Sequence, residues 1–236
     1  MSVAQVVRSF IDNIDNGRLF SYADIESDKK NVIAIELSRL NKQGIVKRLS
    51  KGKYYKPKEG LFGEIAPSDA EVLKSYLSAP NTYITGLKAF NKMGLTTQVP
   101  NVITIATEKQ ARRVKIKNIT IQFVTIKQNI KKEDVYLLRV LDALESMKNI
   151  PNTTVDEVVL YVKNFMQRLS SREVKTMTQY ALKYRPKTKA IFAAILEILN
   201  YSKEAQKIQA TLNPFSSYKM GVSDKILPNK TQWKIV

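Results

Sequence analysis

A run of basic side chains in the first quarter of the chain is the clearest chemical signal in the sequence. Between Arg39 and Lys58 there are eight Lys or Arg residues and no Asp or Glu. The whole chain of 236 residues has 39 basic and 21 acidic residues, a formal net charge of +18. Lys and Arg bind phosphate groups through charge and hydrogen bonds, so this composition is typical of a protein that binds nucleic acid. An anionic membrane surface is a less common partner for such charge.

The composition also excludes several kinds of catalytic site. The chain has no Cys and no His. It therefore has no disulfide, no Cys/His zinc site, no thiolate nucleophile and no Ser-His-Asp triad. Glu173-Val174-Lys175, with Asp156 upstream, matches a fragment of metal-dependent nucleases. Because Glu173 is expected on a helix and short matches arise by chance, we predict no enzymatic activity, no metal and no cofactor.

Three helices are predicted within residues 1–43. Apolar residues at helical spacing indicate a helix over residues 3–14, and a second, short one is expected at 22–25. A third helix is predicted over 29–43, with Ser27 or Asp28 as its N-cap.

After Gly44 the pattern changes from helical to alternating. Residues 45–49 and 52–57 are predicted to be two strands joined by a tight turn. Three helices followed by a basic hairpin are the order of a winged helix-turn-helix domain, which we assign to residues 1–60.

In such a domain the third helix enters the major groove, and the hairpin, or wing, touches the DNA backbone or the minor groove. Phosphate contacts need Lys and Arg, and base contacts need polar residues on the exposed helix face. A winged helix that only binds protein, with a solvated basic face, is the alternative. The candidate DNA-binding residues are Lys29, Lys30, Asn31, Ile35, Arg39, Lys42, Lys47, Arg48, Lys51 and Lys53.

Residues 61–236 are predicted to form a second, α+β domain. Its first part, 61–130, should be mixed. Helices are expected at 68–78 and from Thr85 or Gly86 to Met93, and strands at 102–106, 114–116 and 119–126, the last two turning at Lys117-Asn118. Residues 131–211 should be helical, with helices near 133–148, 154–169, 171–184 and 188–200. The tail, 212–236, either packs back through Phe215, Trp233 and Ile235 or is loose.

Positive charge also gathers in the second domain. This gives a possible additional nucleic-acid face, or else a solvated strand edge that blocks aggregation. Its residues are Lys109, Arg112, Arg113, Lys115 and Lys117, and a further alternating group is Lys183, Arg185, Lys187 and Lys189.

Two stretches carry a family resemblance. The stretch LSRLNKQGIVKRLSKGKYYKP resembles the winged-helix domain of AbiEi-type antitoxins, which belong to type IV toxin–antitoxin (abortive infection) systems. The stretch YITG…FNKMGLTTQVPNVITIAT is similar to the start of the second domain of the same group. The resemblance covers about residues 1–130 and implies a DNA-binding repressor of its own promoter, acting at inverted repeats. It also implies that the second domain neutralises a nucleotidyltransferase-like toxin without forming a stable complex with it.

The alternative is a winged-helix transcriptional regulator whose C-terminal domain senses a ligand or dimerises. No stretch approaches the roughly 20 apolar residues of a membrane span, and the N-terminus lacks the pattern of a secretory signal. We therefore expect a cytoplasmic protein without a membrane partner.

Overall fold

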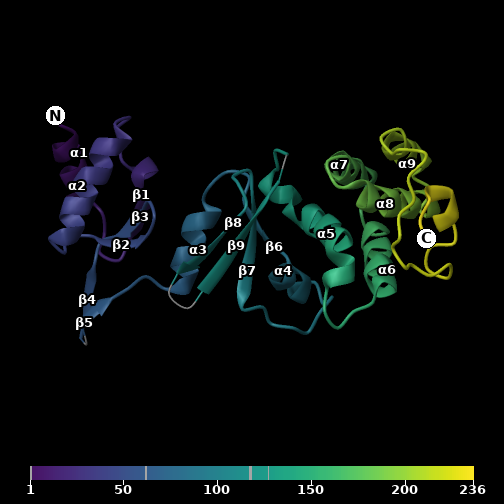
Figure 1. The fold of residues 1–236 in the computed structure, drawn as a ribbon, viewed down its shortest axis with the longest axis horizontal. Coiled ribbons are helices and arrows are strands. Elements are labelled where there is room, and N and C mark those ends of the chain that lie inside the picture. Colours follow the sequence, from purple (N-terminus) through teal and green to yellow (C-terminus); the bar gives the residue numbers. More distant parts are fainter. Residues whose placement is uncertain (1, 62, 117–118, 127) are drawn as a thin grey trace. The chain divides into compact units, whose positions relative to one another are not determined.

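The computed structural model describes residues 2–61, 63–116, 119–126 and 128–236 (Figure 1). Its helices and small sheets make the chain an α+β protein, as predicted. The chain divides into two compact units. The N-terminal unit contains residues 1–80 and 115–119, and the C-terminal unit contains 81–114 and 120–236.

The N-terminal unit begins with helices and a three-stranded sheet. In chain order the elements are α1 (Val3–Asn13), β1 (Leu19–Ser21), the 3-10 helix η1 (Tyr22–Asp24), α2 (Lys30–Lys42), β2 (Lys47–Ser50) and β3 (Lys53–Tyr55). The strand order is β1-β3-β2, with both pairs antiparallel. The predicted helices over 3–14 and 29–43 and the predicted hairpin are confirmed.

The N-cap predicted for α2 is wrong. The helix begins at Lys30, with Lys29 at the N-cap position and no side-chain cap. The carbonyl of Lys29 accepts hydrogen bonds from Val32 N and Ile33 N, which fixes the start of the helix there. The hydroxyl of Ser27 reaches only the backbone N–H of Lys29, at 3.4 Å.

Three strands of the N-terminal unit were not predicted. They are β1 and the small hairpin of β4 (Lys58–Gly60) and β5 (Gly63–Ile65). Each has only three residues, too few to show an alternating pattern. The helix predicted at 68–78 is confirmed as α3 (Asp69–Leu77), which Ser68 and Glu71 cap reciprocally.

A four-stranded sheet with the order β6-β7-β9-β8 lies mainly in the C-terminal unit. Its elements are β6 (Tyr83–Thr85), α4 (Leu87–Lys92), β7 (Val102–Thr107), β8 (Arg112–Ile116) and β9 (Ile119–Thr125). The helix predicted from Thr85 or Gly86 to Met93 begins at Leu87, because Thr85 ends β6 and Gly86, at φ 66°, is the N-cap residue. The predicted turn at Lys117-Asn118 lies outside the described residues.

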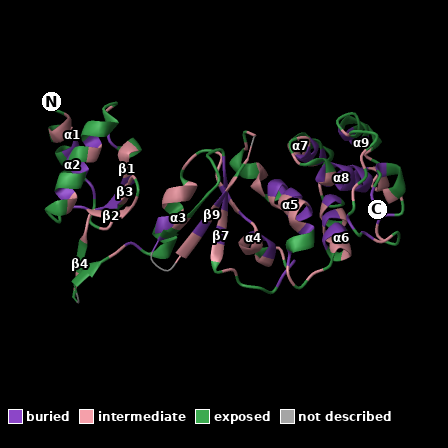
Figure 2. Cartoon of the chain, in the orientation of Figure 1, coloured by how far each residue is buried: buried purple, intermediate pink, exposed green. Residues whose placement is uncertain are grey.

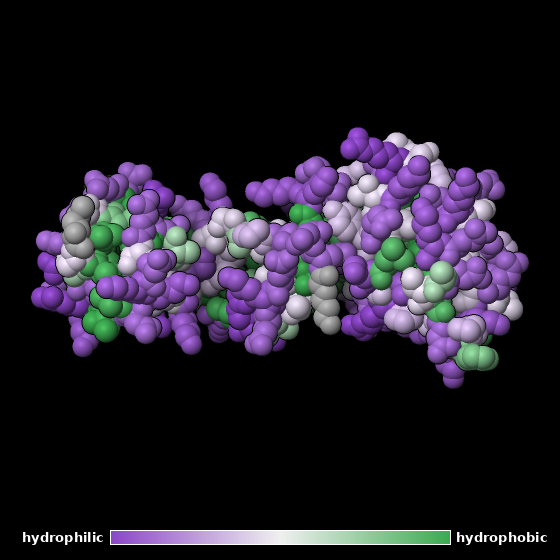
Figure 3. All heavy atoms as spheres, turned by 90° about the horizontal axis from the view of Figure 1, so that it is seen from above, coloured by the Kyte–Doolittle hydropathy of each residue, from purple (hydrophilic) through white to green (hydrophobic). Residues whose placement is uncertain are grey.

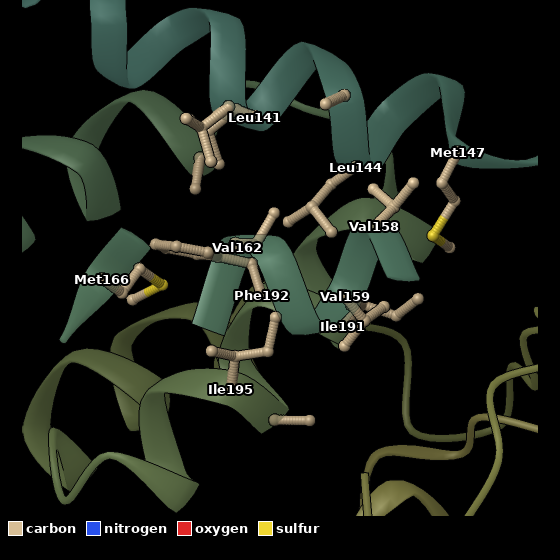
Figure 4. Packing of buried hydrophobic residues seen from close by; sticks show 14 of the residues in the cluster. Leu141, Leu144, Met147, Val158, Val159, Val162, Met166, Ile191, Phe192 and Ile195 are labelled. Carbon is tan, nitrogen blue, oxygen red and sulfur yellow. The ribbon is translucent and has the colours of Figure 1, made fainter. Parts of the chain in front are cut away.

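Helices form the remainder of the C-terminal unit. They are α5 (Val135–Ser146), α6 (Val155–Met166), α7 (Ser171–Ala181), α8 (Pro186–Ile198) and α9 (Ser202–Gln209), with the 3-10 helices η2 (Lys132–Asp134), η3 (Met147–Asn149) and η4 (Lys230–Trp233). All side chains from Thr188 to Leu196 of α8 are buried, so α8 is the central helix of this core. Figure 4 shows Phe192 and Ile195 of α8 among Leu141 of α5 and Val162 of α6. Four of these five α-helices were predicted; α9 was not.

The tail is ordered, which resolves the alternative left open by the sequence. Trp233 and Ile235 are buried, and the indole N–H of Trp233 donates to Glu197 Oε2 at 2.8 Å. Phe215, by contrast, is 95% exposed and does not pack back.

Candidate nucleic-acid interface

Helix α2 has one buried face and one exposed face, which Figure 2 shows in different colours. Its buried side chains are Ile33, Glu36, Leu37 and Leu40. On the opposite side, four exposed residues at positions i, i+4, i+7 and i+11 fall in line, as the helical period requires. This outward ridge consists of Asn31, Ile35, Ser38 and Lys42.

A shallow depression with basic residues at its edge lies along the outward ridge. Ala34, Ile35, Ser38, Arg39 and Lys42 line the depression, which has a volume of about 450 Å³. Two cations thus border an apolar centre formed by Ala34 and Ile35. Such a surface offers contacts to phosphates at its edge and to base edges in its middle.

The β2–β3 hairpin is fixed to the end of α2. The backbone N–H of Arg48 in β2 donates to Asn41 Oδ1 at 2.9 Å, and Ile45 N donates to Leu40 O at 3.0 Å. Gly52, at φ 75°, makes the turn in a left-handed conformation that only glycine adopts at little cost. Arg48 and Lys51 are therefore presented, exposed, from a hairpin whose position relative to the helix is set by hydrogen bonds.

The ten predicted DNA-binding residues do not share one environment. Lys29, Lys30, Asn31, Ile35, Arg39, Lys42, Arg48 and Lys51 are exposed. Lys47 is half-buried, and its ammonium lies 3.5 Å from Glu64 Oε2. Lys53 donates to the carbonyl and hydroxyl oxygens of Ser75 at 2.8 and 2.9 Å and lies over the Tyr76 ring. Lys53 therefore holds α3 against the sheet.

Two tyrosines of β3 stay neutral at physiological pH. Burial and the hydrogen bond with Tyr22 raise the pKa of Tyr54 to about 12. Burial and the hydrogen bond to Glu64 raise the pKa of Tyr55 to about 12. Neither phenol adds negative charge to the basic hairpin.

The second predicted basic face lies around β8. Lys109, Arg112, Arg113 and Lys115 are exposed, and Lys117 lies outside the described residues. The guanidinium of Arg112 stacks over the Phe123 ring at 3.9 Å.

The alternating basic group at 183–189 is only partly available. Arg185 pairs with Glu145 Oε1 at 2.8 Å, and Lys189 is buried, donating to Thr211 Oγ1 at 2.8 Å. Lys189 is therefore held in the core of the C-terminal unit, whereas the Arg185 side chain is 75% exposed and pairs with Glu145 at the surface.

Residues 7–175 match a protein-family model described as "Family of unknown function (DUF6088)". The chain belongs to this family. The matched range runs from α1 to α7 and so includes the outward ridge and the β2–β3 hairpin. A search of curated proteins finds no match.

A solved structure is similar to this DUF6088 protein. It is titled "Crystal structure of RV2827C protein from Mycobacterium tuberculosis" and shares 12% sequence identity, with a TM-score of 0.43. The similarity covers 92% of the present chain and 83% of that chain.

Sequence reasoning missed a polar site in the C-terminal unit of this DUF6088 protein. Asp142 of α5 accepts three side-chain hydrogen bonds: from Tyr83 at 2.9 Å, Thr85 at 2.5 Å and Tyr184 at 2.6 Å. Burial raises the pKa of Asp142, and the three hydrogen bonds oppose that rise. Burial and the neighbouring carboxylate raise the pKa of both tyrosines well above the ordinary value.

These residues lie in a cavity of about 500 Å³. Its wall also contains Gly86, Glu145, Lys183 and Arg185. The YITG sequence that carried part of the family resemblance supplies Tyr83, Thr85 and Gly86, and it was the only available signal for this site.

The nuclease-like fragment has a local structural role. Glu173 caps α7 through Ser170 and accepts a hydrogen bond from Tyr136, while Asp156 accepts one from Ser223 N. No cluster of three or more carboxylates that could hold a metal ion occurs among the described residues.

No helix in the described part of the chain is both long and apolar enough to span a membrane. Most of the face drawn in Figure 3 is hydrophilic, with apolar atoms in small separate groups.

Proposed function

We propose that the N-terminal unit is a winged helix-turn-helix domain that binds double-stranded DNA. In this proposal α2 enters the major groove and the β2–β3 hairpin is the wing. The observation that carries it is that Arg39 and Lys42, exposed on α2, and Arg48 and Lys51, exposed on the β2–β3 hairpin, come from two elements that a hydrogen bond joins. DNA recognition needs both phosphate contacts and base contacts. In this proposal the cations of α2 and of the hairpin bind phosphates, and the outward ridge contacts the bases.

The biological role proposed for this DNA binding is repression of the protein's own operon by an antitoxin. The support is the sequence resemblance of residues 1–130 to AbiEi-type antitoxins. On this proposal the C-terminal unit neutralises a nucleotidyltransferase-like toxin in the cytoplasm. Expression of a neighbouring toxin gene with and without the full chain tests this role, and loss of growth in both cases would contradict it.

A mobility-shift titration of the full chain tests DNA binding. The DNA lying upstream of its own gene is compared with a scrambled duplex of equal composition, at about 50 and 200 mM salt. We expect the upstream DNA to bind more tightly, with the preference retained at the higher salt. Equal and equally salt-sensitive binding to both duplexes would mean that the charge of +18 only attracts polyanions.

The cavity around Asp142 favours a second candidate, a regulator whose C-terminal unit senses a small molecule. Its volume of about 500 Å³ is within the range of small-ligand pockets. A small molecule that raises the melting temperature of the full chain and changes its affinity for DNA would support this candidate. A Tyr184→Phe variant, which removes one hydrogen bond to Asp142, is the matched control for cavity binding.

A further inference from the structure

We infer that the outward ridge of α2 reads an A·T-containing step in the major groove, with Asn31 on an adenine and Ile35 on the 5-methyl group of a thymine. This inference rests on the proposed DNA binding and specifies which base pairs are read. It starts from an apolar side chain that no folding requirement explains.

Ile35 is unusual for its place on the helix. It is 70% exposed, although its neighbours along the outward ridge are all polar or charged. The side chains that α2 buries in the core are on the opposite side of the helix and include Ile33, Leu37 and Leu40. Ile35 therefore contributes little to packing, and its apolar atoms are open to a partner.

The residues around Ile35 indicate what that partner is. Arg39 and Lys42 line the same depression and favour an anionic partner over an apolar protein surface. Within DNA, the apolar group accessible in the major groove is the thymine methyl. The aliphatic Ile35 side chain can pack on that methyl group in the groove, while Arg39 and Lys42 contact the phosphate groups beside it.

Asn31 adds the second half of the recognition. A side-chain amide pairs with adenine by donating to N7 and accepting from N6, a contact specific to that base. Residues four apart on a helix are separated by about 6 Å along its axis. Successive base pairs are about 3.4 Å apart, so Asn31 and Ile35 reach base pairs one or two steps apart.

The test changes single functional groups of the DNA bases. The full chain first selects its preferred duplex from a random library. Each thymine of that duplex is then replaced in turn by uracil, which lacks only the 5-methyl group, and each adenine by 7-deazaadenine, which lacks N7. The affinity of each duplex is measured for the wild type, Ile35→Ala, Asn31→Ala and the control Val99→Ala, whose side chain is 78% exposed in the C-terminal unit.

For the wild type, we expect uracil at one position to weaken binding about fourfold, the value of one buried methylene-sized group. We expect 7-deazaadenine one or two base pairs away to weaken it about threefold or more. Ile35→Ala should bind thymine and uracil duplexes equally, and Asn31→Ala should tolerate 7-deazaadenine. Val99→Ala should keep both preferences.

Two results overturn the inference while leaving DNA binding intact: a wild type that tolerates uracil at every position, or a uracil penalty that persists in Ile35→Ala. Failure to select any preferred duplex would instead overturn the proposed function itself. Because alanine is the best helix former, neither helix variant should unfold α2, and circular dichroism checks this.

Discussion

Arg8 of α1 donates a hydrogen bond from its Nε to the buried carboxylate of Glu36 on α2, at a distance of 2.9 Å. The Glu36 side chain is 8% exposed and the Arg8 side chain is 49% exposed. One ion pair therefore joins the first helix to the helix that carries the outward ridge. Glu36 has a second, weaker partner in Arg39, at 4.0 Å.

We expect Arg8→Met to lower the free energy of unfolding by about 1–2 kcal/mol. Removal of one partner leaves a buried charge, and the half-exposed guanidinium and Arg39 reduce the usual cost. Adding Glu36→Leu should recover most of the loss, because a buried apolar side chain needs no partner. Urea denaturation of both variants measures this; additive losses would show that the two residues do not interact.

The proposed DNA contacts make a prediction about salt. Arg39→Ala and Lys51→Ala should each weaken binding to all duplexes and reduce the slope of log affinity against log salt by about 0.9. Lys203→Ala, at an exposed position on α9, is the matched control and should change neither. Unchanged slopes in both test variants would remove these residues from the interface.

At Gly86 an added methyl group would meet both a close neighbour and an unfavourable backbone conformation. A Cβ there would lie 2.8 Å from Thr104 Oγ1 and 2.9 Å from its Cβ, and the residue has φ 66°. Gly86→Ala should therefore lower stability by about 1–3 kcal/mol, from strain and the close contact together. In the double variant with Thr104→Ala, the part of the lost unfolding free energy that is due to the close contact should be recovered. If nothing is recovered, the whole loss comes from backbone strain.

Protonation of Glu173 at low pH should lower the stability of the C-terminal unit. Hydrogen bonds from Ser170 and Tyr136 lower its pKa from the ordinary 4.5 to about 2. This carboxylate then stabilises the fold above pH 4.5 and loses that effect as the pH falls towards 2.

Urea denaturation between pH 5 and 2 measures this dependence in the wild type, Glu173→Gln and Tyr136→Phe. We expect the decline in unfolding free energy to be shallower in Glu173→Gln and intermediate in Tyr136→Phe. Equal declines in all three proteins would contradict the assignment.

Local patterns in the sequence predicted the helix of the candidate interface well. Ile33, Leu37 and Leu40 repeat at helical spacing, so α2 could be located without its neighbours. Strand β1 could not, because its three residues become a strand only through pairing of Leu19 with Tyr55, far along the chain. The structural role of Lys53 could not be predicted either, because its hydrogen-bond partner Ser75 is 22 residues away in the sequence.

The site around Asp142 was hidden for a related reason. Tyr83 and Thr85 lie 59 and 57 residues from Asp142 in sequence, and the YITG stretch that contains them gives no indication of Asp142 as their partner. Only the packing of β6 against α5 brings them together. Sequence periodicity reports which side of an element is buried, but not which polar groups meet there.

The strand order of the C-terminal sheet has a kinetic consequence. β7 pairs with β9 in parallel, from Val102 with Thr120 to Thr107 with Thr125, while β8 lies on the far side of β9. β8 and β9 are neighbours both in sequence and in the sheet, so they can pair quickly, but the parallel pair closes a larger loop that already contains β8. Docking of β7 on the β8–β9 pair is therefore the slow step expected in refolding, and truncation of Ile105, which is fully buried in β7, should delay it.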